Sequence, residues 1–242
     1  MNQFNEFTLF GPLHLLIILA LIVGILLVFL FRSDKRLRYI LAAVLIIQIV
    51  AFNSKHLING TYSIENYLPF HLCTLSAIIA PIALLTKNKL LQTLLLFWGF
   101  IPALLAILLP DVSRTENFTT FRFWEFFVSH IFIVFSSLYL AIHTDSKFLL
   151  NKFSTWKQIV LSYVILSIYA IGIVFPINYI LNSNYLYLAR KSSNGMGFLP
   201  DGQLYLPSLF TLAFLVFILE AFIYSLFVGY KNYTKNRGPI GD

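Results

Sequence analysis

The sequence is poor in charged residues and contains a single cysteine. Only 11% of its 242 residues are charged, while 59% are hydrophobic. A soluble globular domain has roughly 25% charged residues. Cys73 has no second cysteine to pair with, so an internal disulfide is excluded and the redox compartment cannot be inferred. The shortage of charge points to a protein of the lipid bilayer.

Motifs for several kinds of site are also missing. The chain has no HExxH or similarly spaced group of zinc ligands, no glycine-rich phosphate loop and no GxSxG turn of a serine hydrolase. It has no nucleic-acid-binding module and no visible internal repeat, although transporters built from inverted repeats usually show one. The sequence therefore predicts no metal, no cofactor and no nucleic-acid partner.

The chain does contain a series of long apolar blocks separated by short polar segments. Each block approaches the roughly 20 residues that a helix needs to cross a bilayer. We predict an all-α polytopic membrane protein, with one seven-helix transmembrane domain over residues 1–242. The first block is expected to be a true span rather than a cleaved signal peptide, because it is long and lacks a small-residue cleavage site. The expected spans are 12–31, 38–54, 68–86, 90–109, 121–143, 157–181 and 204–230.

Positive charge is distributed unequally between the two sides of these spans. With seven crossings, 12 of the 17 lysine and arginine residues fall on the side that holds the C-terminus, and 5 fall on the other side. Cytoplasmic loops of membrane proteins carry an excess of Lys and Arg. We therefore predict a multi-pass protein of the cell membrane, with the N-terminus outside and the C-terminus in the cytoplasm.

Two residues in the outer half of the predicted bundle could perform chemistry together. Cys73 lies about 8 Å and His130 about 13 Å inside the outer ends of their helices, at 1.5 Å per residue. A thiolate is a nucleophile, and a histidine within reach can accept the thiol proton. His71 is closer in sequence, but residues two apart on a helix point about 200° apart. The alternative for Cys73 is a small packing residue.

Other polar residues are expected near the same outer half. Asp111 could orient an imidazole, and Asn178 or a backbone N–H beside Pro69 could stabilise an oxyanion. His71 is more simply an interfacial or structural residue at a helix end. The outer loop 182–203 offers basic and aromatic side chains that suit a lipid phosphate headgroup, or else form an ordinary interfacial belt. These side chains are Tyr185, Tyr187, Arg190 and Lys191.

Four stretches resemble successive motifs of the YwaF-like bacterial integral membrane proteins. They are "LPFHLC", "FWGFIPALLAILLPD", "FRFWEFFVSHIFIVFSSLYL" and "NYLYLARK", and together they cover roughly residues 65–210. That family is similar to eukaryotic transmembrane protein 164, a lipid acyltransferase that works through an acyl-cysteine intermediate. The resemblance implies Cys73 as the nucleophile and His130 as its histidine. The chain departs from the pattern at Leu105, Leu109 and Ser192, which puts headgroup and acceptor specificity in doubt.

Two classes of function follow from these observations. In the first, the protein is an intramembrane acyltransferase acting on phospholipid or lysophospholipid, or a lipid-ester hydrolase with the same residue pair. In the second, it is a small-molecule transporter or sensor, in which the intramembrane Glu220 and helix-breaking prolines serve substrate or proton movement. Membrane lipids are the expected partners in the first class.

Overall fold

In the computed structural model, which describes residues 7–86, 88–110, 119–143, 152–190 and 199–236, the described part of the chain forms helices joined by short loops and has no strands. Short 3-10 turns occur at Tyr185–Tyr187 and Gly202–Leu204, and a π-helical segment, Ala170–Val174, joins α7 to α8. The α-helices are α1 (Pro12–Leu30), α2 (Lys35–Ile58), α3 (Ile64–Tyr67), α4 (Leu72–Thr86), α5 (Lys89–Leu108), α6 (Phe121–Ile142), α7 (Lys152–Tyr169), α8 (Phe175–Leu181) and α9 (Tyr205–Asn236).

The prediction of an all-helical, multi-pass membrane protein is confirmed, whereas the count of seven spans is not. Among the described residues, six helices are long and apolar enough to cross a membrane. The predicted span 68–86 differs, because its helix is the 15-residue α4. Leu68 is extended, with φ −64° and ψ 148°, as expected for a residue that precedes a proline. Pro69 therefore delays the start of the helix to Leu72.

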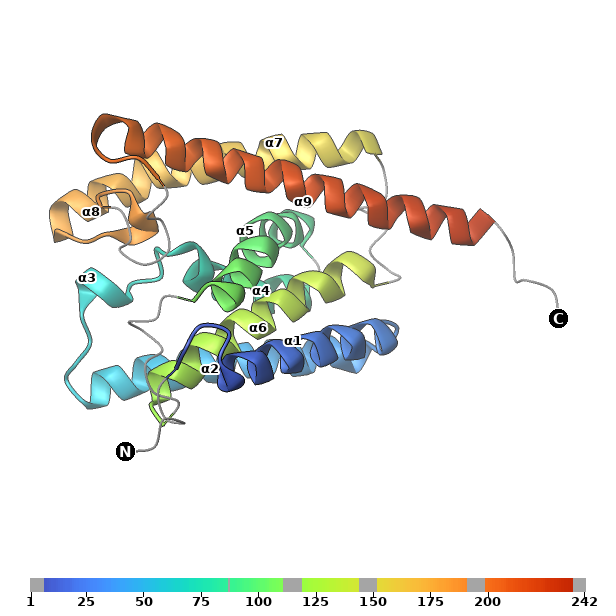
Figure 1. Ribbon diagram of the computed structural model, residues 1–242, viewed down its shortest axis with the longest axis horizontal. Helices are drawn as coiled ribbons and strands as arrows, with labels where there is room; N and C mark the ends of the chain where they lie inside the picture. Colours follow the sequence, from blue (N-terminus) through green and yellow to red (C-terminus); the bar gives the residue numbers. More distant parts are fainter. Residues whose placement is uncertain (1–6, 87, 111–118, 144–151, 191–198, 237–242) are drawn as a thin grey trace.

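Four helices form the centre of the molecule. α4, α5 and α6 pack against one another, and α2 packs against α4 and α6. α1 lies on α6, while α7 and α9 lie side by side and contact α5 (Figure 1). α4 is thus packed among longer helices, and its first turn is partly buried, with Leu72 and Cys73 of intermediate exposure.

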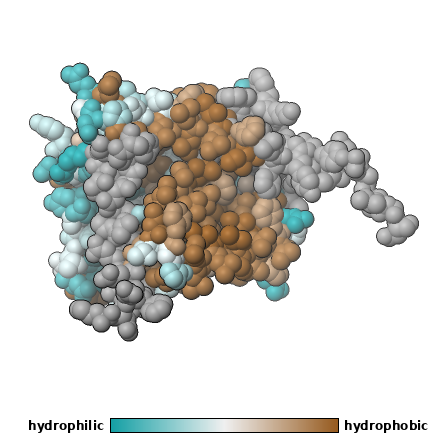
Figure 2. Space-filling view, in the orientation of Figure 1, coloured by the Kyte–Doolittle hydropathy of each residue, from teal (hydrophilic) through white to brown (hydrophobic). Residues whose placement is uncertain are grey.

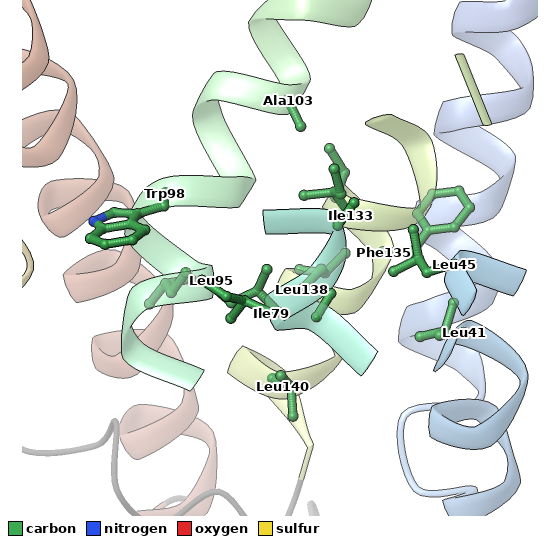
Figure 3. Close-up of a cluster of buried hydrophobic side chains, with 14 of the residues drawn as sticks. Leu41, Leu45, Ile79, Leu95, Trp98, Ala103, Ile133, Phe135, Leu138 and Leu140 are labelled. Atoms are coloured by element: carbon green, nitrogen blue, oxygen red, sulfur yellow. The ribbon is translucent and has the colours of Figure 1, made fainter. Parts of the chain in front are cut away.

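Small side chains allow the central helices to approach closely. A Cβ atom added at Gly99 of α5 would lie 2.9 Å from the Ile133 side chain of α6, and one at Gly24 of α1 would lie 2.0 Å from the Phe135 ring. The Ser137 hydroxyl donates to the Leu95 carbonyl across the α5–α6 contact, at 3.2 Å. Small residues and interhelical hydroxyl bonds are typical of helix packing in membranes. Figure 3 shows part of the cluster of buried hydrophobic side chains between these helices, which includes Trp98 and Phe135 as well as aliphatic residues.

The exposed surface is apolar around the middle of the bundle. Figure 2 shows a broad hydrophobic band, with hydrophilic residues gathered mainly at the end where α3 and α8 lie. Large apolar side chains of α1, α2 and α7 point outward, among them Leu30, Ile47 and Ile168. Such an exposed apolar area is expected where lipid replaces water as the solvent.

The non-helical segment 68–71, which leads into α4, has its backbone groups bonded by tyrosines. The Tyr185 hydroxyl accepts from the Leu68 N–H at 3.0 Å and donates to the Ile64 carbonyl. The Tyr169 hydroxyl donates to the Phe70 carbonyl at 3.3 Å. Irregular backbone at membrane depth is tolerated only where protein or water satisfies its polar groups. These two tyrosines therefore allow the chain to enter α4 without a continuous helix.

Candidate functional site

A cavity of about 650 Å³ lies among the helices, and both Cys73 and His130 line it. Its volume is in the range of small-molecule binding sites. The walls come from α2, α4, α5, α6, α7 and α9, together with residues near α3 and in the loop after α8. Most of the lining side chains are apolar. The two residues paired by the sequence argument thus lie on the wall of one largely apolar cavity.

Cys73 is the second residue of α4 and is partly buried against the hydrophobic core. The first N–H groups of any helix lack partners within that helix. The positive end of the helix dipole also stabilises negative charge nearby. The sulfur of Cys73 is therefore placed where charge on a thiolate, or on a neighbouring oxyanion, is stabilised by backbone.

His130 is buried in the middle of α6, with 8% of its surface exposed. Its Nδ1 lies 2.6 Å from the Phe126 carbonyl oxygen, and its ring packs on the Phe126 ring at 4.2 Å. A carbonyl oxygen can only accept, so Nδ1 carries the proton. In the neutral ring the lone pair is then on Nε2. This bond fixes the tautomer that can act as a base.

One face of α6 lines the cavity over two turns. The lining residues have the i, i+3, i+4, i+7, i+8 spacing of a single helical face. Thr120 sets the start of this helix, because its hydroxyl accepts from the Phe123 N–H at 3.3 Å. The residues of the face are Arg122, Glu125, Phe126, Ser129 and His130.

A polar network joins α6 to α2 on the cavity wall. The Glu125 carboxylate accepts from Arg122 Nη1 at 2.7 Å and from Gln48 Nε2 at 3.0 Å. The Arg122 guanidinium also lies over the Phe52 ring, 5.2 Å from its centroid. All four of these residues line the cavity. None of the four is among the predicted site residues, although the positions of Arg122 and Glu125 on the helical face that carries His130 are a signal for two of them.

The loop after α8 is held in a strained conformation by two asparagines. The Asn178 amide donates to the Tyr185 carbonyl at 2.9 Å and accepts from the Tyr185 N–H at 2.7 Å. Asn184 bonds both the N–H and the carbonyl of Arg190. Leu186 and Tyr187, which lie between the bonded residues Tyr185 and Arg190, have φ of 54° and 57°, which costs on the order of 1–3 kcal/mol for each such residue. These two side chains line the cavity.

The structure separates the predicted polar residues into two groups. His71 and Tyr187 line the cavity, with their rings 5.4 Å apart. Tyr185 and Asn178 are buried in the loop and its hydrogen bonds, outside the cavity lining. Arg190 is exposed and also outside that lining.

Some predicted residues are not placed at all. Asp111, Lys191 and the side chain of Glu220 lie outside the residues that the structure describes. Within the described part of the chain, no three His, Cys, Asp or Glu side chains gather in a group that could hold a metal ion.

Comparison with known proteins identifies the family. The model of the TMEM164 family matches residues 9–224, and the chain belongs to this family. The predicted resemblance to transmembrane protein 164 is thereby confirmed at the level of family. No curated protein and no solved structure matches the chain.

Proposed function

We propose that this member of the TMEM164 family transfers an acyl chain between membrane lipids through a thioester on Cys73. The observation that carries the proposal is that Cys73 and His130 line one largely apolar cavity. The bond from His130 Nδ1 to the Phe126 carbonyl adds support, because it makes Nε2 the basic nitrogen. An acyl chain needs such an apolar site, and attack on its ester needs a nucleophile and a base.

The proposed reaction has two steps, which are acylation of Cys73 and transfer of the acyl group to an acceptor. In the first, the Cys73 sulfur bonds to the ester carbonyl carbon while the thiol proton passes to His130. The bond to the lipid oxygen breaks, and His130 returns the proton to the leaving lipid alcohol. In the second, the hydroxyl of an acceptor lipid gives its proton to His130 and attacks the thioester carbonyl carbon. The carbon–sulfur bond breaks, and His130 returns the proton to the Cys73 sulfur, which restores the thiol. Backbone N–H groups of the first turn of α4 stabilise the oxyanion in both steps.

Hydrolysis differs only in the acceptor, because water then takes the place of the second lipid alcohol. The residues of the first step are the same in both cases. The products distinguish them: free fatty acid indicates hydrolysis, and a newly acylated lipid indicates transfer.

The test is the intact mass of the purified protein after incubation with mixed phospholipids. We expect an acyl adduct on the wild type that hydroxylamine removes, no adduct on Cys73→Ala, and a strongly reduced rate on His130→Ala. His56→Ala is the matched control, because this histidine lies outside the cavity lining. An adduct that persists on Cys73→Ala, or lipid turnover without Cys73, would contradict the covalent mechanism.

A further inference from the structure

The polar end of the cavity carries a charge pair that the acyl-transfer chemistry does not use. Arg122 and Glu125 are the two Asp, Glu, Lys or Arg residues among its lining. They are joined at 2.7 Å, and their side chains are 35% and 13% exposed. Ionisable groups inside a membrane protein are costly and usually mark a site. The Arg122 side chain is partly exposed and lines the cavity, so a ligand in the cavity can contact it.

Beside this pair lies a hydrogen-bond acceptor without a donor. Gln48 gives its amide N–H to Glu125 at 3.0 Å. Its Oε1 atom is buried and has no hydrogen-bond partner among the described residues. A buried acceptor left unbonded destabilises a protein, so a position of this kind suits a ligand that brings an N–H or O–H. The cavity end therefore combines one cationic donor with amide and carboxylate acceptors.

The distance from this polar end to the candidate base suits a glycerolipid. Arg122 precedes His130 by eight residues, or about 12 Å along the helix axis, but its guanidinium extends to Glu125, which is only five residues or about 8 Å before His130. In a phospholipid, five bonds of roughly 1.5 Å join the phosphorus to the carbonyl carbon of the neighbouring ester, a reach of about 6 Å. Apolar side chains of α9 also line the cavity, among them Phe210, Ala213 and Phe217. A lipid can thus place its headgroup, ester and chain along one cavity.

We propose that Arg122, Glu125 and Gln48 form a headgroup subsite for phospholipids whose headgroup carries hydrogen-bond donors. This inference rests on the proposed lipid substrate and adds the class of headgroup. The Arg122 guanidinium binds the phosphate, because its planar fork matches two phosphate oxygens. Gln48 Oε1 and the Glu125 carboxylate accept from a primary ammonium or from glycerol hydroxyls. A choline headgroup has no N–H or O–H and leaves Gln48 unbonded, so it binds less well.

The test measures lipid retention by native mass spectrometry, in the Cys73→Ala background where no thioester can form. Phosphatidylethanolamine, phosphatidylglycerol, phosphatidylcholine and diacylglycerol with identical chains compete in one mixture. We expect the first two to be retained about tenfold over phosphatidylcholine, and phosphatidylcholine in turn to be retained over diacylglycerol, which lacks the phosphate that Arg122 binds. Arg122→Gln should lower retention of both to the level of diacylglycerol. Gln48→Leu should remove the preference over choline while keeping the preference over diacylglycerol.

Matched variants separate the subsite from a general effect of positive charge. Lys55→Gln removes a nearby exposed cation that lies outside the cavity lining, and should leave the preferences unchanged. If Arg122→Gln does not fold, Arg122→Lys keeps the charge without the fork and should lower phospholipid retention in part. Equal retention of all four lipids by the Cys73→Ala protein would overturn the subsite. So would a loss with Arg190→Gln as large as that with Arg122→Gln.

The acyl-transfer mechanism and the headgroup subsite can be tested independently, because different results would contradict each of them. A protein that forms no acyl adduct but retains donor-bearing phospholipids selectively would overturn the transferase mechanism and support the subsite. A protein that forms the adduct equally well from every headgroup would support the mechanism and overturn the subsite.

Discussion

At the scale of single residues, the hydrogen bond of His130 separates its chemical role from its structural one. Asparagine can replace the Nδ1–H donor to the Phe126 carbonyl but has no counterpart of Nε2. We expect His130→Asn to keep the thermal stability close to that of the wild type. The rate of adduct formation should fall by about 10²–10⁴-fold, the usual contribution of a positioned base. Time-resolved intact mass gives the rate, and thermal unfolding in detergent gives the stability.

His130→Ala completes that comparison. This variant loses both the basic Nε2 and the hydrogen bond to the Phe126 carbonyl. It should therefore form adduct as slowly as His130→Asn and also have a lower thermal stability. A His130→Asn protein that forms adduct at the wild-type rate would show that Nε2 is not the base.

Tyr185 gives a prediction about alkaline pH. Its ring is fully buried, and burial raises the pKa of its phenol above the ordinary value of 10.0. The protonated phenol donates to the Ile64 carbonyl, so the folded state holds this proton more tightly than the unfolded state. Its stabilising effect is complete below the ordinary pKa and declines as the pH rises towards the folded-state pKa. We expect the melting temperature of the wild type to fall above about pH 10.

Tyr185→Phe should be less stable at neutral pH, by about 1–3 kcal/mol for the backbone groups left unbonded. Its melting temperature should also fall less steeply with pH than that of the wild type. Tyr179→Phe is the control, because that side chain is 88% exposed. Parallel pH profiles for wild type and Tyr185→Phe would rule out titration of this phenol as the cause.

At the scale of helices, the position of α6 was predictable from the sequence, whereas the long-range hydrogen bond that stabilises the segment before α4 was not. The boundaries of α6 and the cavity position of His130 follow from a long apolar block with regular helical spacing. Pro69 is a local signal for the break before Leu72, but the hydrogen bond that stabilises the break comes from Tyr185, which is 117 residues from Leu68 in sequence. The same bond explains why Tyr185, predicted near a lipid headgroup, is buried in the protein. No local pattern encodes a contact of that kind.

Pro102 in α5 is likewise accommodated by a contact between residues that are distant in sequence, and this contact leads to a testable prediction. Pro102 has no N–H, so it cannot bond the Trp98 carbonyl one turn earlier. The Ser76 hydroxyl of α4 donates to that carbonyl instead, at 3.1 Å. We expect Ser76→Ala to lower the free energy of unfolding by about 1–2 kcal/mol. In a Pro102→Ala background the helix can bond the carbonyl itself, so the same change should cost markedly less.

A double-mutant cycle of thermal or denaturant unfolding measures this coupling. Equal costs of Ser76→Ala in both backgrounds would show that the serine does not replace the missing helix bond. Gly172→Ala is a useful reference, because its added Cβ would meet nothing within 4 Å.

At the scale of the whole molecule, the short α4 determines the depth of Cys73. Its 15 residues extend about 22 Å, whereas the hydrocarbon core is about 30 Å thick. If Thr86 reaches the inner boundary, the first turn of α4 begins about 8 Å below the outer one. That depth lies among the acyl chains, below the ester groups at the boundary of the hydrocarbon core, so a lipid ester has to reach Cys73 along the cavity rather than from the aqueous surface.

This depth assignment depends on the orientation, which stays a prediction from the distribution of Lys and Arg. It can be measured with cysteine reporters in a Cys73→Ser background. Asn59→Cys and Ser33→Cys are exposed positions just beyond opposite ends of α2. We expect a membrane-impermeant maleimide to label Asn59→Cys in intact cells, and to label Ser33→Cys only after permeabilisation. The reverse pattern would place Cys73 near the cytoplasmic leaflet, so its lipid substrates would have to come from that leaflet.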